Sequence, residues 1–201
     1  MRRPWNELAP VELSHPVACL RPVVEEHREA LRELARDESI WANFTSRPST
    51  DEDFAAFFDT MLSDQAAGKR FTFTVMDARS GAVAGSSAYA ALDEKHDRLE
   101  IGASWLAPAF QGTGVNQAAK YLLLRHAFEV LRCRRVEFKT DVLNVPARRA
   151  LESIGATEEG VARSFNYMPS GRRRDAVYYS VLDSEWDQVA ETILAHPRLK
   201  D

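Results

Sequence analysis

The chain has 201 residues, of which 45% are hydrophobic and 28% charged, as is typical of a globular protein with a full core. A formal net charge of -4 argues against general nucleic-acid binding, which usually needs a basic face. No run approaches the roughly 20 apolar residues of a membrane span, and the N-terminus lacks the apolar stretch of a signal peptide. We therefore expect one domain over residues 1–201, located in the cytoplasm and not bound to a membrane.

Apolar periodicity and capping residues predict alternating strands and helices. In chain order we expect a strand over 17–21, a helix over 24–36, a helix that begins at the capping residues 49–52 and stops at Gly68, strands over 71–76, 83–92 and 99–106, a helix over 115–131, a strand over 136–142, a helix over 146–154, strands over 158–167 and 176–182, and a last helix that begins at Ser184 and ends near His196. Antiparallel hairpins beside one strand–helix–strand crossover indicate an α+β fold.

Two segments have alternative interpretations. Phe54, Phe57 and Phe58 follow one another at helical spacing, which is typical of core, although one edge of this stripe could line a pocket. The run Arg172-Arg173-Arg174 is the densest basic segment, and a solvated turn is its plainest interpretation.

A loop with two glycines joins the strand at 99–106 to the helix at 115–131. Gly112 and Gly114 let the backbone approach a ligand closely, and the free N–H groups of the helix's first turn favour an anion. We expect a pyrophosphate here. The loop lacks the third glycine of a dinucleotide motif and the Gly-Lys-Ser/Thr of a P-loop, and the alternative is a connector without a ligand.

At these residues the chain resembles the GNAT N-acetyltransferase superfamily, and within it the group related to Rim-type ribosomal-protein N-terminal acetyltransferases. The family's loop reads Gln/Arg-x-x-Gly-x-Gly/Ala; residues 111–116 match its first four positions and depart at Asn116. Residues 100–105, Asn144 and residues 159–163 match further motifs, so that the resemblance covers about 15–190.

The resemblance implies a mixed, mostly antiparallel sheet of about seven strands flanked by helices. It also implies acetyl-CoA as co-substrate, a primary amine as acceptor, no metal, and allows a homodimer. The residues expected to bind the coenzyme are Gln111, Gly112, Thr113, Gly114, Val115, Asn116 and Asn144. Asn144 would bond the pantetheine arm, or alternatively cap the helix that follows it.

Only a neutral amine attacks a thioester, so a base is a more useful catalytic group here than an acid. Glu100 is the candidate, acting through water, and the alternative is a structural ion pair with a residue such as Lys139. Ser104 lies four residues on and would share Glu100's face in a regular strand. It would bind the acceptor, or alternatively be a buried hydroxyl.

The general acid of many family members is missing from this sequence. A Tyr is replaced by Leu151, and a Ser common in the Rim-type group by Ala147. A thiol with a pKa of about 8.5 is a good leaving group, which makes this loss tolerable. The leading hypothesis is direct acetyl transfer to a protein N-terminus or a small amine. The alternatives are an antibiotic- or polyamine-modifying acetyltransferase and a non-catalytic acyl-CoA-binding module.

Overall fold

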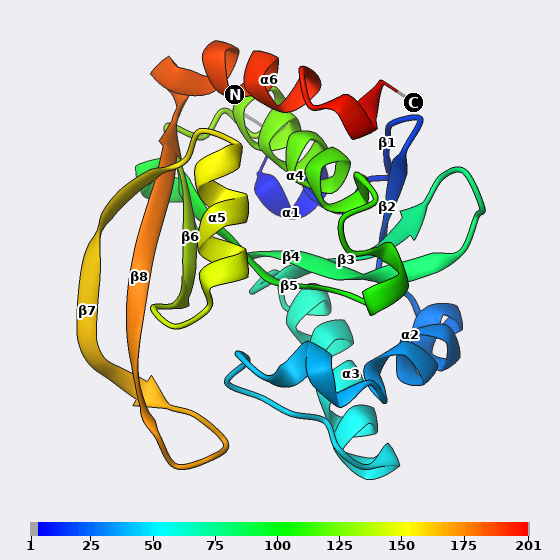
Figure 1. Ribbon diagram of the computed structural model, residues 1–201. Helices are drawn as coiled ribbons and strands as arrows, with labels where there is room; N and C mark the ends of the chain where they lie inside the picture. Colours follow the sequence, from blue (N-terminus) through cyan, green and yellow to red (C-terminus); the bar gives the residue numbers. More distant parts are fainter. Residues whose placement is uncertain (1–3, 201) are drawn as a thin grey trace.

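One mixed sheet carries the strands of the computed structural model, which describes residues 4–200. Its spatial order is β1-β2-β3-β4-β5-β6-β8-β7 (Figure 1). In the chain the strands are β1 (Leu13–Ser14), β2 (Ala18–Pro22), β3 (Phe71–Asp77), β4 (Val83–Asp93), β5 (Arg98–Leu106), β6 (Arg135–Asp141), β7 (Thr157–Tyr167) and β8 (Arg173–Leu182). Strands β5 and β6 pair in parallel and the other neighbours antiparallel, which confirms the mixed, mostly antiparallel sheet. The strand beyond the seven expected is β1, whose two residues are too short to show a pattern.

The helices flank this sheet. They are α1 (Trp5–Leu8), α2 (Arg28–Ala35), α3 (Asp51–Ala66), α4 (Val115–Arg125), α5 (Val145–Ser153) and α6 (Trp186–Leu194). A π-helical turn over His126–Val130 continues α4, so the long helix expected over 115–131 is present in two geometries. None of the helices in residues 4–200 is long and apolar enough to cross a membrane.

The ends of two helices show what capping residues can and cannot specify. Helix α3 begins as predicted, because the Thr50 hydroxyl accepts from the Asp53 amide while the Asp53 carboxylate accepts from the Thr50 amide. The predicted start at Ser184 is wrong. A 3-10 turn over Asp183–Glu185 comes first, because the Glu185 carboxylate accepts from the Leu182 amide and closes that turn before α6 begins.

Two hydrophobic cores lie on opposite faces of the sheet. Helix α4 covers one face, where Leu122 and Leu123 are fully buried, and α2 and α3 cover the other (Figure 1). Phe54 and Phe58 of α3 lie in the second core, as expected for a core stripe. Phe57 is only partly buried and lies at its edge.

Strands β5 and β6 separate part-way along their length. Their parallel pairing ends at Glu100 opposite Glu137, although β5 continues to Leu106 and β6 to Asp141. Just beyond this point β5 carries a bulge, where Ala103 has a φ of 48° and the pairing with β4 shifts.

The bulge exchanges the two faces of β5. Leu99 and Ile101 pack in the core beneath α4. Trp105 would point the same way in a regular strand, yet it packs in the core beside α3. After the bulge, odd-numbered residues of β5 therefore point to the face of α3, whereas before it they point to the face of α4.

Candidate active site

Two connected cavities lie beside β5, and the larger of them reaches the opening between β5 and β6. One, of about 410 Å³, reaches Gln111 and Gly112 in the loop before α4. The other, of about 520 Å³, reaches Glu100 and Arg174. They share several lining residues, among them Ser104, Asn116, Lys120 and Asn144, so they form one continuous groove.

The loop before α4 has the backbone that a phosphate-binding turn needs. Gly112 has a φ of +70°, and a Cβ built there would find no atom within 4 Å. Gly114 has a φ of +97° and directly precedes α4, whose first turn has no side-chain cap among the described residues. The N–H groups of that turn are therefore left to a ligand or water. This geometry fits the pyrophosphate of a coenzyme A thioester.

The other predicted loop residues have distinct surroundings. Gln111 donates from Nε2 to the carbonyl of Leu106 at 2.9 Å, and the Thr113 hydroxyl donates to the carbonyl of Phe110 at 2.7 Å. The Val115 side chain is fully buried in the core, so only its backbone can serve a ligand. Asn116 lines both cavities.

Gly114 has a second constraint that the sequence did not reveal. A Cβ at this position would lie 2.7 Å from the backbone oxygen of Arg198. The C-terminal turn over Pro197–Leu199 thus packs against the start of α4, and Gly114 is required by this contact as well as by its φ.

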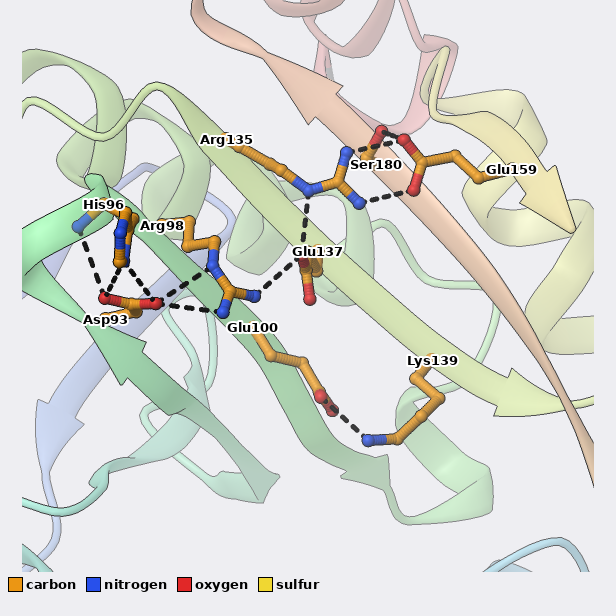
Figure 2. A network of polar contacts seen from close by, with 9 residues as sticks. All are labelled: Asp93, His96, Arg98, Glu100, Arg135, Glu137, Lys139, Glu159 and Ser180. Atoms are coloured by element: carbon orange, nitrogen blue, oxygen red, sulfur yellow. Dashed lines mark hydrogen bonds and ion pairs between the residues drawn. The ribbon is translucent and has the colours of Figure 1, made fainter. Parts of the chain in front are cut away.

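Glu100 lies at the point where β5 and β6 part. Its Oε2 accepts from Nζ of Lys139 at 3.0 Å across the two strands, as Figure 2 shows. Nearer the paired ends of the strands, Arg98 and Arg135 both contact the Glu137 carboxylate. The ion pair with Lys139, which was the alternative to a catalytic role for Glu100, is therefore present. Glu100 also lines the larger cavity, so a catalytic role stays a prediction.

Ser104 does not lie on Glu100's face, and the prediction of a shared face is wrong. The bulge at Ala103 turns Ser104 toward α4, where its hydroxyl accepts from Nζ of Lys120 at 2.7 Å. On β4, the hydroxyl of Ser87 lies 2.7 Å from the same Oγ.

Asn144 takes the role foreseen as its alternative. Its Oδ1 accepts from the amide of Ala147 at 3.2 Å and caps α5, and its Nδ2 donates to Thr140. The side chain also borders both cavities, so contact with a pantetheine arm stays a prediction.

Lys120 and Arg174, two basic residues that were not expected at the site from the sequence, line the groove. Lys120 is 8% exposed, and burial lowers the pKa of its ammonium to about 7, while the charge of Glu100 acts in the opposite direction. Arg174 is 7% exposed, and burial lowers its pKa as well. The sequence does contain a weak indication that Lys120 is buried, because the apolar residues Leu124 and Ala127 follow it at helical spacing and both are buried.

The interpretation of residues 172–174 as a solvated turn is therefore wrong for Arg174, whereas Arg172 and Arg173 are exposed. Arg174 is buried at the groove, and the guanidinium of Arg172 pairs with the fully buried carboxylate of Asp141. A buried carboxylate needs such a partner, which accounts for the arginine at position 172.

Two of the positions that depart from the family pattern, where relatives have a Tyr or a Ser, face the groove. Ala147 lines both cavities and Leu151 lines the larger one. Neither side chain can donate a proton, so another group must protonate the leaving sulfur or it departs as the thiolate.

The acetyltransferase (GNAT) domain family matches residues 18–157, which include β5, the glycine loop and α4. The chain belongs to the GNAT acetyltransferase family. Members of this family transfer acetyl groups from acetyl-CoA to amines. The predicted fold, family and N-acetyltransferase activity are thereby confirmed.

Individual relatives agree with this assignment. YdaF of Bacillus subtilis strain 168, provisionally named a ribosomal N-acetyltransferase, is 39% identical over 107 residues, which are 53% of this chain and 57% of YdaF. The matching part is thus little more than half of YdaF. A provisionally named acetyltransferase from T. thermophilus is 35% identical with a TM-score of 0.84, over 94% of this chain and 97% of that one. RimJ of Mycobacterium smegmatis, solved with CoA-disulfide, shares the fold at 22% identity and a TM-score of 0.78, over 94% of each chain.

Proposed function

We propose that this GNAT enzyme acetylates a single primary amine on an acceptor whose remaining part is neutral or acidic, and that a peptide N-terminus is the best candidate. The observation that carries the proposal is the charge of the larger cavity. Among its described lining residues Glu100 is the one acid, and the bases are Arg70, Lys120, Lys139 and Arg174. A polyamine or an aminoglycoside would bring several positive charges into this basic site, and like charges disfavour such complexes.

The arrangement supports a role for each side of the groove. The backbone at residues 112–116 would hold the pyrophosphate, and Asn144 borders the path of the pantetheine arm. Glu100 would take the proton from the attacking nitrogen through a water molecule. The buried Arg174 guanidinium, whose Nε has no partner among the described residues, would receive the carbonyl oxygen next to a peptide's terminal amine.

The name given to YdaF, which calls it a ribosomal N-acetyltransferase, is compatible with a protein acceptor. An antibiotic- or polyamine-modifying enzyme fits less well, because the cavity is basic. A non-catalytic module is the other alternative, and the assay below tests it. A single domain, a homodimer and a cytoplasmic location stay predictions.

The test is a free-thiol release assay with acetyl-CoA and a panel of acceptors matched in concentration. The panel contains peptides with different first residues, the same peptides with blocked N-termini, spermidine and an aminoglycoside. We expect a kcat/KM at least about tenfold higher for a free peptide N-terminus than for either polycation, which corresponds to about 1.4 kcal/mol. Equal or better turnover of the polycations would refute the proposed acceptor class, and coenzyme binding without thiol release on any amine would support the non-catalytic alternative.

A further inference from the structure

A buried lysine lies at the junction of the two cavities. Lys120 projects from the second turn of α4, and its Nζ donates to Oγ of Ser104 at 2.7 Å. The same Nζ lies 5.4 Å from the centre of the Phe138 ring on β6. Lys120 therefore stands in the opening between β5 and β6, with a strand on either side.

No carboxylate of the described residues forms an ion pair with Lys120. Buried lysines are usually paired, because an isolated ammonium is costly to desolvate. Three charged groups face the same cavity from the strands around it: Glu100 on β5, Lys139 on β6 and Arg174 on β8. Glu100 is already paired with Lys139, so the hydrogen-bond acceptor of the Lys120 ammonium is the hydroxyl of Ser104. Because no carboxylate stabilises its charge at short range, this ammonium is a stronger acid than an exposed lysine.

The position of Lys120 relative to the two substrates follows from the groove. The coenzyme's pyrophosphate end belongs at Gly112, in the smaller cavity, and the acceptor's amine belongs near Glu100, in the larger one. The thioester must lie where the cavities meet, and this is where Lys120 lies. The positions at which many relatives have a proton donor or a serine are occupied by Leu151 and Ala147.

We propose that Lys120 is the general acid of this enzyme and gives a proton to the coenzyme's sulfur as the thioester breaks. This inference rests on acetyl transfer in this groove and not on the identity of the acceptor.

Bonds and protons balance in this step. The acceptor nitrogen forms a bond to the acetyl carbon, and the C–S bond breaks with its electron pair on sulfur. The Lys120 ammonium donates a proton to that sulfur, so coenzyme A departs as the thiol and Lys120 becomes a neutral amine. The nitrogen's surplus proton goes to Glu100, and its passage from Glu100 to Lys120 restores both groups. Ser104 is a positioning residue, because its hydrogen bond fixes the ammonium.

The first test needs no acceptor. Bound coenzyme A is titrated in wild type and in Lys120→Met by the ultraviolet absorbance of its thiolate, with the desulfo coenzyme as blank. An ammonium beside the sulfur lowers the thiol's pKa, so Lys120→Met should raise the pH at which the thiolate forms by about 1–3 units. Lys69→Met, which removes an exposed lysine outside the groove, should leave this titration where the wild type has it.

The second test separates catalysis from binding. With one accepted amine, Lys120→Met should lower kcat by about 10²-fold or more, the usual contribution of a general acid, and change the KM for acetyl-CoA by less than about threefold. Lys120→Gln serves in both tests if the Met variant does not fold. An unchanged thiol titration in a folded Lys120 variant overturns the proposal, as does an effect confined to KM. The titration does not bear on the proposed acceptor class because it contains no acceptor, and the kinetic test does not because it can be run with any accepted amine.

Discussion

The carboxylate of Glu100 folds over Gly102 on the same strand, so closely that a Cβ at residue 102 would stand 2.6 Å from Oε1. The glycine thus gives the carboxylate its place beside the groove. Because the group in the way is the far end of a flexible side chain, it can move aside without disturbing the backbone, although it then leaves its ion pair with Lys139. The pair offers a way to displace the candidate base without altering its chemistry.

We expect Gly102→Ala to fold with a melting temperature close to that of wild type and to lower kcat by about tenfold or more, because the displaced carboxylate no longer meets the acceptor's proton. The measurement is steady-state kinetics beside thermal unfolding. In a Glu100→Gln background the same alanine should cost nothing further. If the double variant instead loses the product of the two single-variant factors in kcat, Gly102→Ala does not act through the position of the Glu100 carboxylate.

Glu100→Gln keeps the shape of the side chain and removes the base. It should lower kcat at neutral pH by about 10²–10⁴-fold, and by less at high pH, where the acceptor amine is deprotonated by solvent. Glu137→Gln is the matched control, since Glu137 pairs in register with Glu100 but does not line the larger cavity. Equal pH–rate profiles for both variants, within about threefold of wild type, would show that Glu100 is structural.

The glycine loop can be tested with two alanines of equal backbone strain. Gly112 and Gly81 have φ values of +70° and +73°, and a Cβ placed on either residue would have no atom within 4 Å. Both alanines should cost similar stability, about 1–2 kcal/mol. Only Gly112→Ala should weaken acetyl-CoA binding, by about tenfold, because its methyl group blocks close approach of a phosphate. Calorimetry that gives equal affinities for both variants contradicts this. Gly114 suits the test less, since a side chain there also displaces Arg198.

Lys120 makes stability depend on pH. Its folded pKa of about 7 lies below the ordinary lysine value of 10.5, so the unfolded chain binds more protons between these values and the stability of the wild type rises with pH across this window. Below about pH 7 both states are protonated and the full cost of burying the ammonium is present. Lys120→Met should therefore melt above wild type, with a larger gain at about pH 6 than at about pH 9. A gain that is constant with pH, or a loss at both values, would mean that Lys120 is not buried as an unpaired cation.

Arg174→Gln should raise the KM for a peptide acceptor and lower kcat/KM by about tenfold, because a charged donor to the acceptor's carbonyl is lost. Arg173→Gln is the control. Arg173 is exposed and bonds Ser164 outside the groove, so its removal should leave the peptide kinetics unchanged. If the two variants behave alike, Arg174 does not contact the acceptor.

The sequence predicted those parts of the site that depend on local chemistry. A strand, a loop with Gly112 and Gly114 and an amphipathic helix follow one another within a short stretch, and each has its own residue pattern. The Glu100-Ile101-Gly102 motif belongs to the same stretch. The alternatives for Glu100 and Asn144, an ion pair and a helix cap, were also visible from the sequence and are present.

The rest depends on how distant elements meet. Nothing about Ala103 predicts a positive φ, since alanine rarely adopts one, and without that bulge the side of the sheet reached by Ser104 cannot be deduced. The burial of Lys120 and Arg174 likewise follows from the opening between β5 and β6, which is a tertiary feature. The sequence therefore identified the family and predicted a loop for the coenzyme, but it did not single out Lys120 and Arg174, the buried basic residues that line the groove.

Because β5 exchanges its faces at Ala103 and parts from β6 there, the groove beside it is accessible from both sides of the sheet. A coenzyme bound from the α4 side and an acceptor bound from the α3 side would meet at the thioester carbon, without either one crossing the other's route. Such partners have no need of an enzyme nucleophile to carry the acetyl group from one to the other. The proposed direct transfer within a ternary complex is compatible with this arrangement of the fold.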